Sequence, residues 1–258
     1  MIKEAIWMWR YAKRFLSRQS ASWVRDLTAW QRFWQSYMRY RQLVPADRQP
    51  SLTYLYPCVG DDTAEILIEP TYFYQDAWAF EKIVRQHPVL HIDVGSHHKF
   101  VALLSKVVPV TEVDIRHWSL PLETLKFQEG SILKLPFEDH SLHSVSSLCV
   151  IEHIGLGRYA DPLDPYGSEK AIEELKRVLA PEGRLYLSVP VGDYNVIAFN
   201  AGRIFSLDYL LELVHPLVIN EQRFIVGKSF QSTYEYKPMF GTTGLFELIN
   251  LKTTIERI

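Results

Sequence analysis

The feature that most constrains this chain is a regular alternation of short apolar runs with amphipathic stretches, which begins at Val89. The run "VLHIDVG" is apolar at nearly every position, as a strand covered on both faces must be. The helical stretch "KFVALLSKVV" follows it, and the same order continues through "VTEVDIR", "LKFQEGSIL", "HSVSSLCVI", "SEKAIEELKRVLA" and "GRLYLSVPV". This alternation implies right-handed crossovers and a mostly parallel sheet with helices on both faces. We therefore predict an α/β fold, in which ligands bind beyond the carboxyl ends of the strands.

The segment before this alternation has a different pattern. No Pro or Gly occurs between about residues 3 and 42, and apolar residues stand there at helical spacing, which predicts two helices. The stretch "VPADRQPSL" then breaks the pattern with two prolines. We therefore expect a helical N-terminal extension over residues 1–50 and an α/β domain over residues 51–258. Within 51–88, "LTYLYP" and "EILIEP" predict short strands and "DAWAFEKIVRQ" a helix.

The N-terminal extension is basic although the whole chain has a net charge of −2. Residues 1–50 hold ten Lys and Arg, three Asp and Glu, and five of the seven tryptophans, which leaves the remainder at −9. Aromatic residues interleaved with Arg are typical of a membrane-surface helix, a nucleic-acid face or a docking arm. The alternative is an arm folded onto its own domain or onto a second subunit, with Arg stems over tryptophan rings. We favour this alternative, and the acidic domain argues against a nucleic-acid partner.

Cysteine content and hydropathy indicate the compartment. Cys58 and Cys149 are too few for a disulfide framework, which favours a reducing cytoplasm. The first twenty residues lack the apolar core of a signal peptide, and no run is long enough to span a bilayer. We expect a cytoplasmic protein with no transmembrane segment and leave open a peripheral membrane contact. The expected partners are a small-molecule or glycan acceptor and, in a homodimer, a second copy of the chain.

Polar residues follow the first two strands of the expected sheet. Asp93 and Gly95 stand where a strand turns sharply into a helix, and glycine lets the backbone approach a ligand closely. Asp114 ends the next strand about twenty residues later, where a carboxylate can accept both hydroxyls of a ribose. Nicotinamide-dependent enzymes use a related glycine pattern, which this stretch lacks.

These residues, together with "GSILKLPFEDHSLHSV" (residues 130–145) and "ELKRVLAPEGRLYLSVP", resemble the class I S-adenosylmethionine-dependent methyltransferases over about residues 88–192. The first loop of that family reads Asp-x-Gly-x-Gly-x-Gly, and here His97 and Lys99 stand at the later glycine positions. The resemblance implies a Rossmann-like methyltransferase fold with a mostly parallel seven-stranded sheet. It also implies that the sheet ends in an antiparallel hairpin formed by "LVINEQRFIVG" and "GLFELINL".

The same resemblance implies S-adenosylmethionine as the cofactor. Ser131 stands where the family commonly has an Asp that receives the adenine amino group, and a serine hydroxyl can accept that hydrogen bond without charge. The residues that we expect to bind the cofactor are Asp93, Gly95, Ser96, Asp114, Ile115, Ser131, Ile132 and Cys149.

The stretch "EHIGLGRYADPLDPYG", with "VPVG" and "FNAGRIF", resembles more specifically an uncharacterised methyltransferase-like family of nematodes and bacteria. Its members read Glu-His-x-Gly-Leu-Gly-Arg-Tyr-Gly-Asp-Pro-Leu-Asp-Pro, and methylation of glycans is the activity suspected for them. We expect His153, together with Glu152, to be catalytic, because methyl transfer to a hydroxyl needs a base with a pKa near neutrality. The residues expected to bind the acceptor are Arg158, Tyr159, Asp161, Asp164 and Arg203.

Each of these assignments has a structural alternative. Glu152 and His153 could cap a helix, Asp-Pro pairs often begin turns, and Arg203 could pair with a loop acid. Asp161 and Asp164 could hold Mg²⁺, but no third ligand is evident, so we predict no metal. Glycines at 155, 157 and 167 suggest that the loop closes as a lid over the acceptor.

The sequence thus predicts an S-adenosylmethionine-dependent O-methyltransferase that acts on a sugar or a glycan precursor. The alternative is a catalytically inactive protein of the same fold that serves as a binding or scaffold partner.

Overall fold

The computed structural model describes residues 27–58, 61, 64–118, 120–238 and 240–251, and the chain divides into two compact units between Ile68 and Glu69. In the first unit, residues 27–43 are helical. Two 3₁₀ turns follow, η1 (Ala46–Arg48) and η2 (Leu52–Tyr54). The earlier of the two helices predicted for the N-terminal extension lies outside the described residues, so that part of the extension stays a prediction.

The second unit is built on one sheet of ten strands. Their bounds are β1 (His91–Val94), β2 (Val110–Asp114), β3 (Leu125–Glu129), β4 (Leu142–Leu148), β5 (Leu179–Gly192), β6 (Val196–Ala198), β7 (Gly202–Ser206), β8 (Val218–Val226), β9 (Ser229–Gln231) and β10 (Thr242–Ile249).

The order of strands across the sheet is β3-β2-β1-β4-β5-β10-β8-β9, with β7 paired to β5 and β6. The pairs among β3, β2, β1, β4 and β5 are all parallel, whereas β10 is antiparallel to both of its neighbours. This confirms the mostly parallel sheet and the predicted terminal hairpin. The seven expected strands are all present, and β6, β7 and β9 are three short additions that the sequence analysis missed.

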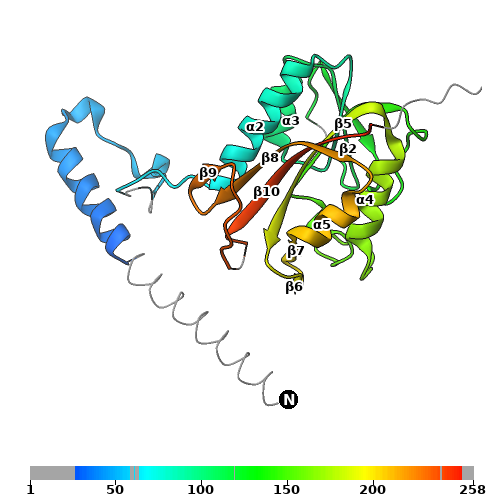
Figure 1. Ribbon diagram of the computed structural model, residues 1–258. Coiled ribbons are helices and arrows are strands. Elements are labelled where there is room, and N and C mark those ends of the chain that lie inside the picture. The colour runs from blue at the N-terminus through cyan, green and yellow to red at the C-terminus, as the bar shows by residue number, and fades with distance from the viewer. Residues whose placement is uncertain (1–26, 59–60, 62–63, 119, 239, 252–258) are drawn as a thin grey trace, which may run out of the picture. The chain divides into compact units, whose positions relative to one another are not determined.

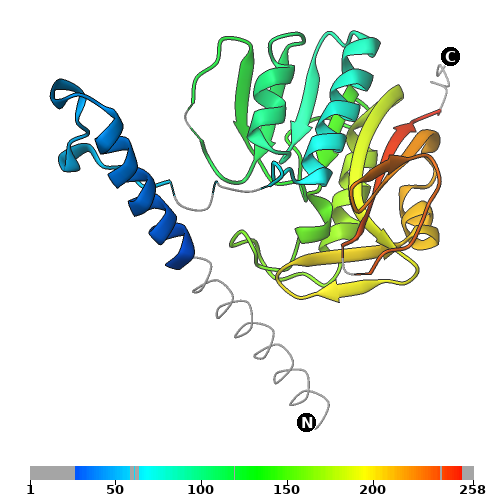
Figure 2. The same ribbon diagram turned by 90° about the vertical axis from the view of Figure 1, so that its left-hand side faces the viewer.

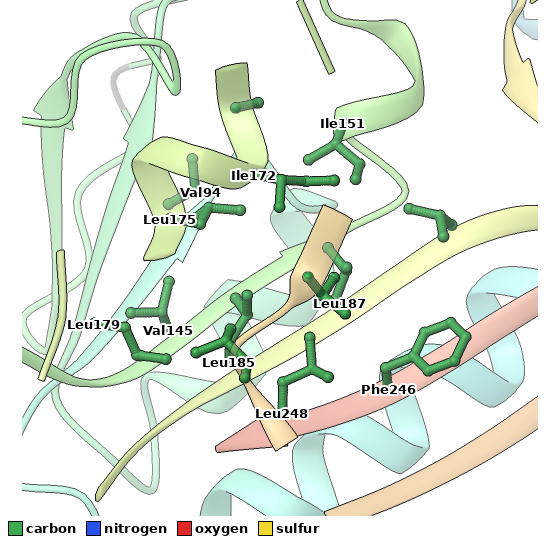
Figure 3. Packing of buried hydrophobic residues seen from close by; sticks show 14 of the residues in the cluster. Val94, Val145, Ile151, Ile172, Leu175, Leu179, Leu185, Leu187, Phe246 and Leu248 are labelled. Carbon is green, nitrogen blue, oxygen red and sulfur yellow. The ribbon is translucent and has the colours of Figure 1, made fainter. Parts of the chain in front are cut away.

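Helices cover both faces of the sheet (Figure 1). Helices α2 (Pro70–Gln86) and α3 (His98–Leu104) lie on one face, and α4 (Gly167–Val178) and α5 (Leu207–Val214) lie on the other. Each face has its own apolar cluster, because successive strand residues point to opposite sides. On β5, Leu185 and Leu187 belong to the cluster under α4, whereas Tyr186 belongs to the one under α2. Figure 3 shows part of the larger cluster, with Ile172 and Leu175 of α4 beside the strand residues.

Two local predictions are wrong. The stretch "LTYLYP" contains the 3₁₀ turn η2, and the residues of "EILIEP" before Pro70 form no strand. Pro70 instead occupies the first turn of α2, where its missing N–H costs nothing, and the Glu69 carboxylate accepts a hydrogen bond from the Tyr72 amide at 2.9 Å. A local cap and a proline therefore outweigh the apolar pattern of "EILI".

Candidate functional site

The carboxyl ends of β1, β2 and β4 meet at one edge of the sheet, and two cavities open there. One has a volume of about 790 Å³ and the other about 610 Å³, both within the range of small-molecule sites. Five residues line both cavities, so the two adjoin: Gly95, Asp114, Arg116, Cys149 and Tyr159. All of these residues except Arg116 are among those predicted from the sequence.

Asp93, at the end of β1, supports the loop that follows it. Its side chain is fully buried; Oδ1 accepts a hydrogen bond from the Ser96 amide at 3.0 Å, and Oδ2 accepts one from Ser146 Oγ at 2.5 Å. Ser146 Oγ in turn lies 2.8 Å from His91 Nε2, and burial lowers the pKa of His91 to about 3. Burial raises the pKa of Asp93 to about 6. Asp93 lines neither cavity, so this geometry supports a role in holding the loop rather than the predicted contact with a cofactor.

Gly95 and Cys149 bring backbone to the cavities from β1 and β4. Gly95 has φ +72°, and a Cβ there would lie 3.2 Å from Val150 Cγ1, so a side chain would be strained and crowded. Cys149 also has a positive φ, 54°, and its thiol donates to Gln75 Oε1 at 3.2 Å. Ser96 Oγ accepts a hydrogen bond from the Leu148 amide at 3.0 Å, which ties the two loops together. The pattern Asp-x-Gly in the sequence indicated this close backbone approach.

Asp114, at the end of β2, is paired with Arg116. Its Oδ1 accepts from the Arg116 amide at 2.8 Å and from Nε at 3.1 Å, and its Oδ2 accepts from Nη2 at 2.9 Å. The same guanidinium lies over the ring of Tyr159, with Cζ 4.4 Å from the ring centroid. Arg116 therefore links β2 to the loop after β4 and occupies the carboxylate that we expected to hold a ribose. The sequence offered one signal for it, a cation two residues after the expected acid.

The cavity of about 610 Å³ brings together several of the predicted residues. Ile115 and Ile132 provide apolar walls, and Ser131 and Asp114 add polar side chains to the same lining. Ser131 Oγ accepts a hydrogen bond from the Leu133 amide at 3.2 Å, and its hydroxyl proton has no partner of its own among these contacts. His153 and Asp161 complete the wall from the loop after β4. A flat apolar ring with polar edges fits such a lining.

The loop of residues 154–167 is pinned at its base by Arg203. This side chain is 5% exposed, and its Nη1 donates to the Ile154 carbonyl at 2.5 Å and to Ser168 Oγ at 3.0 Å. Its Nη2 donates to the carbonyls of Asp164, at 3.1 Å, and Pro165, at 3.3 Å. These bonds engage the guanidinium with the loop and with α4, and the binding of an acceptor by Arg203 stays a prediction.

The glycines of this loop permit close packing of backbone. A Cβ at Gly155 would lie 2.2 Å from the Asp164 carbonyl oxygen, and one at Gly167 would lie 2.6 Å from that of Ile154. The Asp164 amide also donates to the Gly155 carbonyl at 3.0 Å. The two ends of the loop are thus bonded to each other, and its closure as a lid over the acceptor stays a prediction.

The two loop acids also serve the loop itself. Asp161 accepts hydrogen bonds from the amides of Gly155, at 2.6 Å, and Tyr159, at 3.2 Å. Asp164 accepts from the Tyr166 amide and from Lys170 Nζ, and the Lys170 ammonium holds the pKa of Asp164 below its usual value. Asp161 still lines the cavity, whereas Asp164 lines neither. Among the described residues, no three His, Cys, Asp or Glu side chains gather in a group that could hold a metal ion.

His153 and Glu152, the expected catalytic pair, have unusual protonation. Burial, and then the neighbouring Arg158, lower the pKa of His153 to about 4, whereas burial raises the pKa of Glu152 to about 8. Glu152 is 2% exposed, its Oε2 has no hydrogen-bond partner, and Oε1 lies 3.7 Å from His153 Nε2. Arg158 Nη1 lies 3.3 Å from His153 Nδ1 and donates to the Ala201 carbonyl at 2.7 Å. This corrects the expectation of a base with a pKa near neutrality: His153 is neutral at pH 7 and weakly basic.

Comparisons with known proteins bear on the fold. The family model described as "Caenorhabditis protein of unknown function, DUF268" matches residues 136–214. No curated protein matches the sequence.

Several solved structures resemble this chain. The N-methyltransferase NodS from Bradyrhizobium japonicum WM9, in complex with S-adenosyl-L-homocysteine, is 16% identical with a TM-score of 0.50, covering 84% of this chain and 98% of that chain. The structure of NodS described without that ligand is 13% identical with a TM-score of 0.50, and the match covers 71% of this chain and 98% of NodS. The 1,6-didemethyltoxoflavin-N1-methyltransferase from Burkholderia thailandensis is 15% identical with a TM-score of 0.48, and the match covers 74% of this chain and 94% of that enzyme. The strand order, the terminal antiparallel hairpin and the likeness to NodS agree, and the chain has the Rossmann-like fold of the class I S-adenosylmethionine-dependent methyltransferases.

Proposed function

We propose that this protein binds S-adenosylmethionine at the carboxyl edge of β1, β2 and β3 and methylates a hydroxyl of a sugar or glycan precursor. The observation that carries the proposal is the meeting of Gly95, Asp114 and Ser131 with His153 around a single cavity of about 610 Å³. Three of these residues come from the ends of successive strands, and the fourth comes from the loop after β4.

The residues present fit such a cofactor. The positive φ of Gly95 leaves its backbone open at the cavity, where a ligand can approach without a side chain in the way. Ile115 and Ile132 are suited to an adenine ring, the Ser131 hydroxyl can reach a polar edge of it, and Asp114 can hold ribose hydroxyls. When bound, the cofactor supplies an electrophilic methyl group on a sulfonium.

In this proposal His153 accepts the proton of the acceptor hydroxyl, because it is neutral at pH 7 and lines the cavity. Its low basicity limits the contribution of proton transfer, so positioning of the acceptor carries more of the rate. Tyr159 and Asp161 line the same cavity and can hydrogen-bond sugar hydroxyls. Glu152, protonated at pH 7 by its raised pKa, stabilises the site rather than acting as a base.

One observation favours the inactive alternative. Arg116 makes three hydrogen bonds to Asp114, so a ribose must displace the guanidinium before Asp114 can hold its hydroxyls. If that displacement is too costly, the chain keeps the fold without binding the cofactor and acts as a binding or scaffold protein.

Calorimetric titration with S-adenosyl-L-homocysteine separates these two functions. We expect wild-type binding, a weakening of about 1.5–3 kcal/mol in Asp114→Asn, and equal or tighter binding in Arg116→Gln, which frees the Asp114 carboxylate. A wild-type chain that does not bind the ligand supports the inactive alternative. Binding that is unchanged in Asp114→Asn removes Asp114 from the site. Transfer of a labelled methyl group to sugar acceptors then tests the hydroxyl specificity.

The remaining expectations belong to the same proposal. No helix among the described residues is long and apolar enough to cross a membrane. The proposed cytoplasmic location rests on the low cysteine content of the sequence. We also propose a homodimer, which size-exclusion chromatography with light scattering tests directly.

A further inference from the structure

The larger cavity owes its existence to an unusually short connection between β2 and β3. Parallel neighbours are normally joined by a dozen or more residues, usually with a helix. Here residues 115–124 make the connection, and their described part contains no helix (Figure 2). Trp118, Leu120 and Leu122 of this loop, together with α3, wall a space of about 790 Å³ on the face of the sheet that α2 and α3 cover.

Glu112 of β2 lines this cavity and is the group in it that most needs a partner. It is 2% exposed, and its Oε2 has no hydrogen-bond partner. In the register of β1 with β2, Glu112 lies directly opposite Asp93, which is also buried. Two acids placed side by side on neighbouring strands repel each other when both are ionised. Burial, followed by the charges of Asp93 and Asp114, raises the pKa of Glu112 to about 8.

No cation of the described chain neutralises this acid. The one that acts on it, Arg116, is engaged by both oxygens of Asp114, and the ion pairs of the described residues do not include Glu112. An unpaired buried acid is unfavourable, and a cation brought by a ligand would relieve it. Tyr72 and Trp118 supply aromatic rings along the same cavity, and such rings also favour a cation.

We propose that the cavity floored by Glu112 binds the ammonium group of a small organic amine. The Trp118 side chain lines the same cavity and interacts with the Glu112 carboxyl, which leaves the acid without a cationic partner. The cavity thus offers an acid for the amine.

The test compares ethanolamine with ethylene glycol, which differ only by an ammonium in place of a hydroxyl. Each is titrated calorimetrically into the full chain at pH 7.5 in two buffers of different ionisation enthalpy. We expect ethanolamine to bind at least tenfold more tightly than ethylene glycol and to release a proton from Glu112, which the buffer comparison measures. Equal binding of the two probes, or binding of ethanolamine without proton release, overturns the proposal.

Variants provide the second readout. Glu112→Gln should reduce the affinity for ethanolamine to that for ethylene glycol and abolish the proton release. Glu129→Gln is the matched control, because it removes one carboxylate from the exposed end of the neighbouring strand β3. Ethanolamine binding that survives in Glu112→Gln overturns the proposal, and the wild-type proton release decides the matter if that variant fails to fold.

The ammonium could also be the one carried by the proposed cofactor, since Gly95 and Cys149 line this cavity too. Repeating the ethanolamine titration with saturating S-adenosyl-L-homocysteine distinguishes the two sources. Retained binding indicates a separate amine ligand. Lost binding, with weaker S-adenosyl-L-homocysteine binding in Glu112→Gln, indicates that the cofactor's own ammonium fills the site. A chain that binds ethanolamine but never S-adenosyl-L-homocysteine retains this inference and loses the proposed function.

Discussion

Arg203 provides the sharpest test of how the loop after β4 is built. Its guanidinium donates to three backbone carbonyls and to one hydroxyl, and the residue is 5% exposed. A hydrogen bond to a charged group contributes about 1.5–3 kcal/mol net, and part of this sum offsets the desolvation of the buried cation. We therefore expect Arg203→Met to lower the free energy of unfolding by about 3 kcal/mol, a large share of the roughly 5–15 kcal/mol that natural domains have.

The assay is urea unfolding followed by circular dichroism, with amide hydrogen exchange of the native protein. Besides the loss of stability, exchange should become faster at the Asp164 amide, which bonds to the Gly155 carbonyl, and at the Gly167 amide, which bonds to the Asp164 carbonyl. Arg158→Met is the matched control. Arg158 is exposed and has one backbone acceptor, the Ala201 carbonyl, so we expect Arg158→Met to lower the free energy of unfolding by less than about 1 kcal/mol.

A loss below about 1 kcal/mol in Arg203→Met, with unchanged exchange in the loop, would refute this reasoning. In that case the carbonyls are satisfied without the guanidinium, and the expectation that Arg203 faces a ligand is favoured.

The fold could be predicted because its signals are local. A strand such as β1 is buried on both faces, so its apolar run is visible without knowledge of its neighbours. Gly95 and Asp114 were identifiable for a similar reason, since a residue at the end of a buried parallel strand must lie at the ligand edge of the sheet.

The sequence could not indicate contacts between residues far apart in the chain. Arg203 is bonded to carbonyls 38 to 49 residues earlier, and no local pattern indicates that pairing. The protonation of Glu152 and His153 likewise depends on burial, which raises the pKa of Glu152 to about 8 and lowers the pKa of His153 to about 4. The sequence did not indicate that the connection from β2 to β3 lacks a helix. The cavity of about 790 Å³ beside this connection, and Glu112 in its lining, were therefore not predicted.

Two further predictions follow from the same geometry. Gly155→Ala should lower the free energy of unfolding by several kcal/mol, because φ is +79° and the new Cβ would lie 2.2 Å from a carbonyl oxygen. Gly157→Ala should lower it by about 1 kcal/mol, because its φ is +67° but its nearest neighbour is a flexible leucine methyl group 3.1 Å away. Melting temperatures that fall equally in the two variants would contradict this. The last prediction concerns pH. The pKa of Glu152 is raised from 4.5 to about 8 in the folded state, so the folded protein binds this proton more tightly than the unfolded chain does. The contribution of the protonated Glu152 to the free energy of unfolding is therefore fully present below about pH 4.5 and is lost as the pH rises toward 8. Glu152→Gln, which cannot ionise, should therefore show a smaller loss of unfolding free energy between pH 5.5 and pH 8 than wild type, while Glu129→Gln, an exposed acid, should follow the wild-type curve. Parallel curves for wild type and Glu152→Gln would show that this carboxyl ionises in the folded protein as easily as in the unfolded chain.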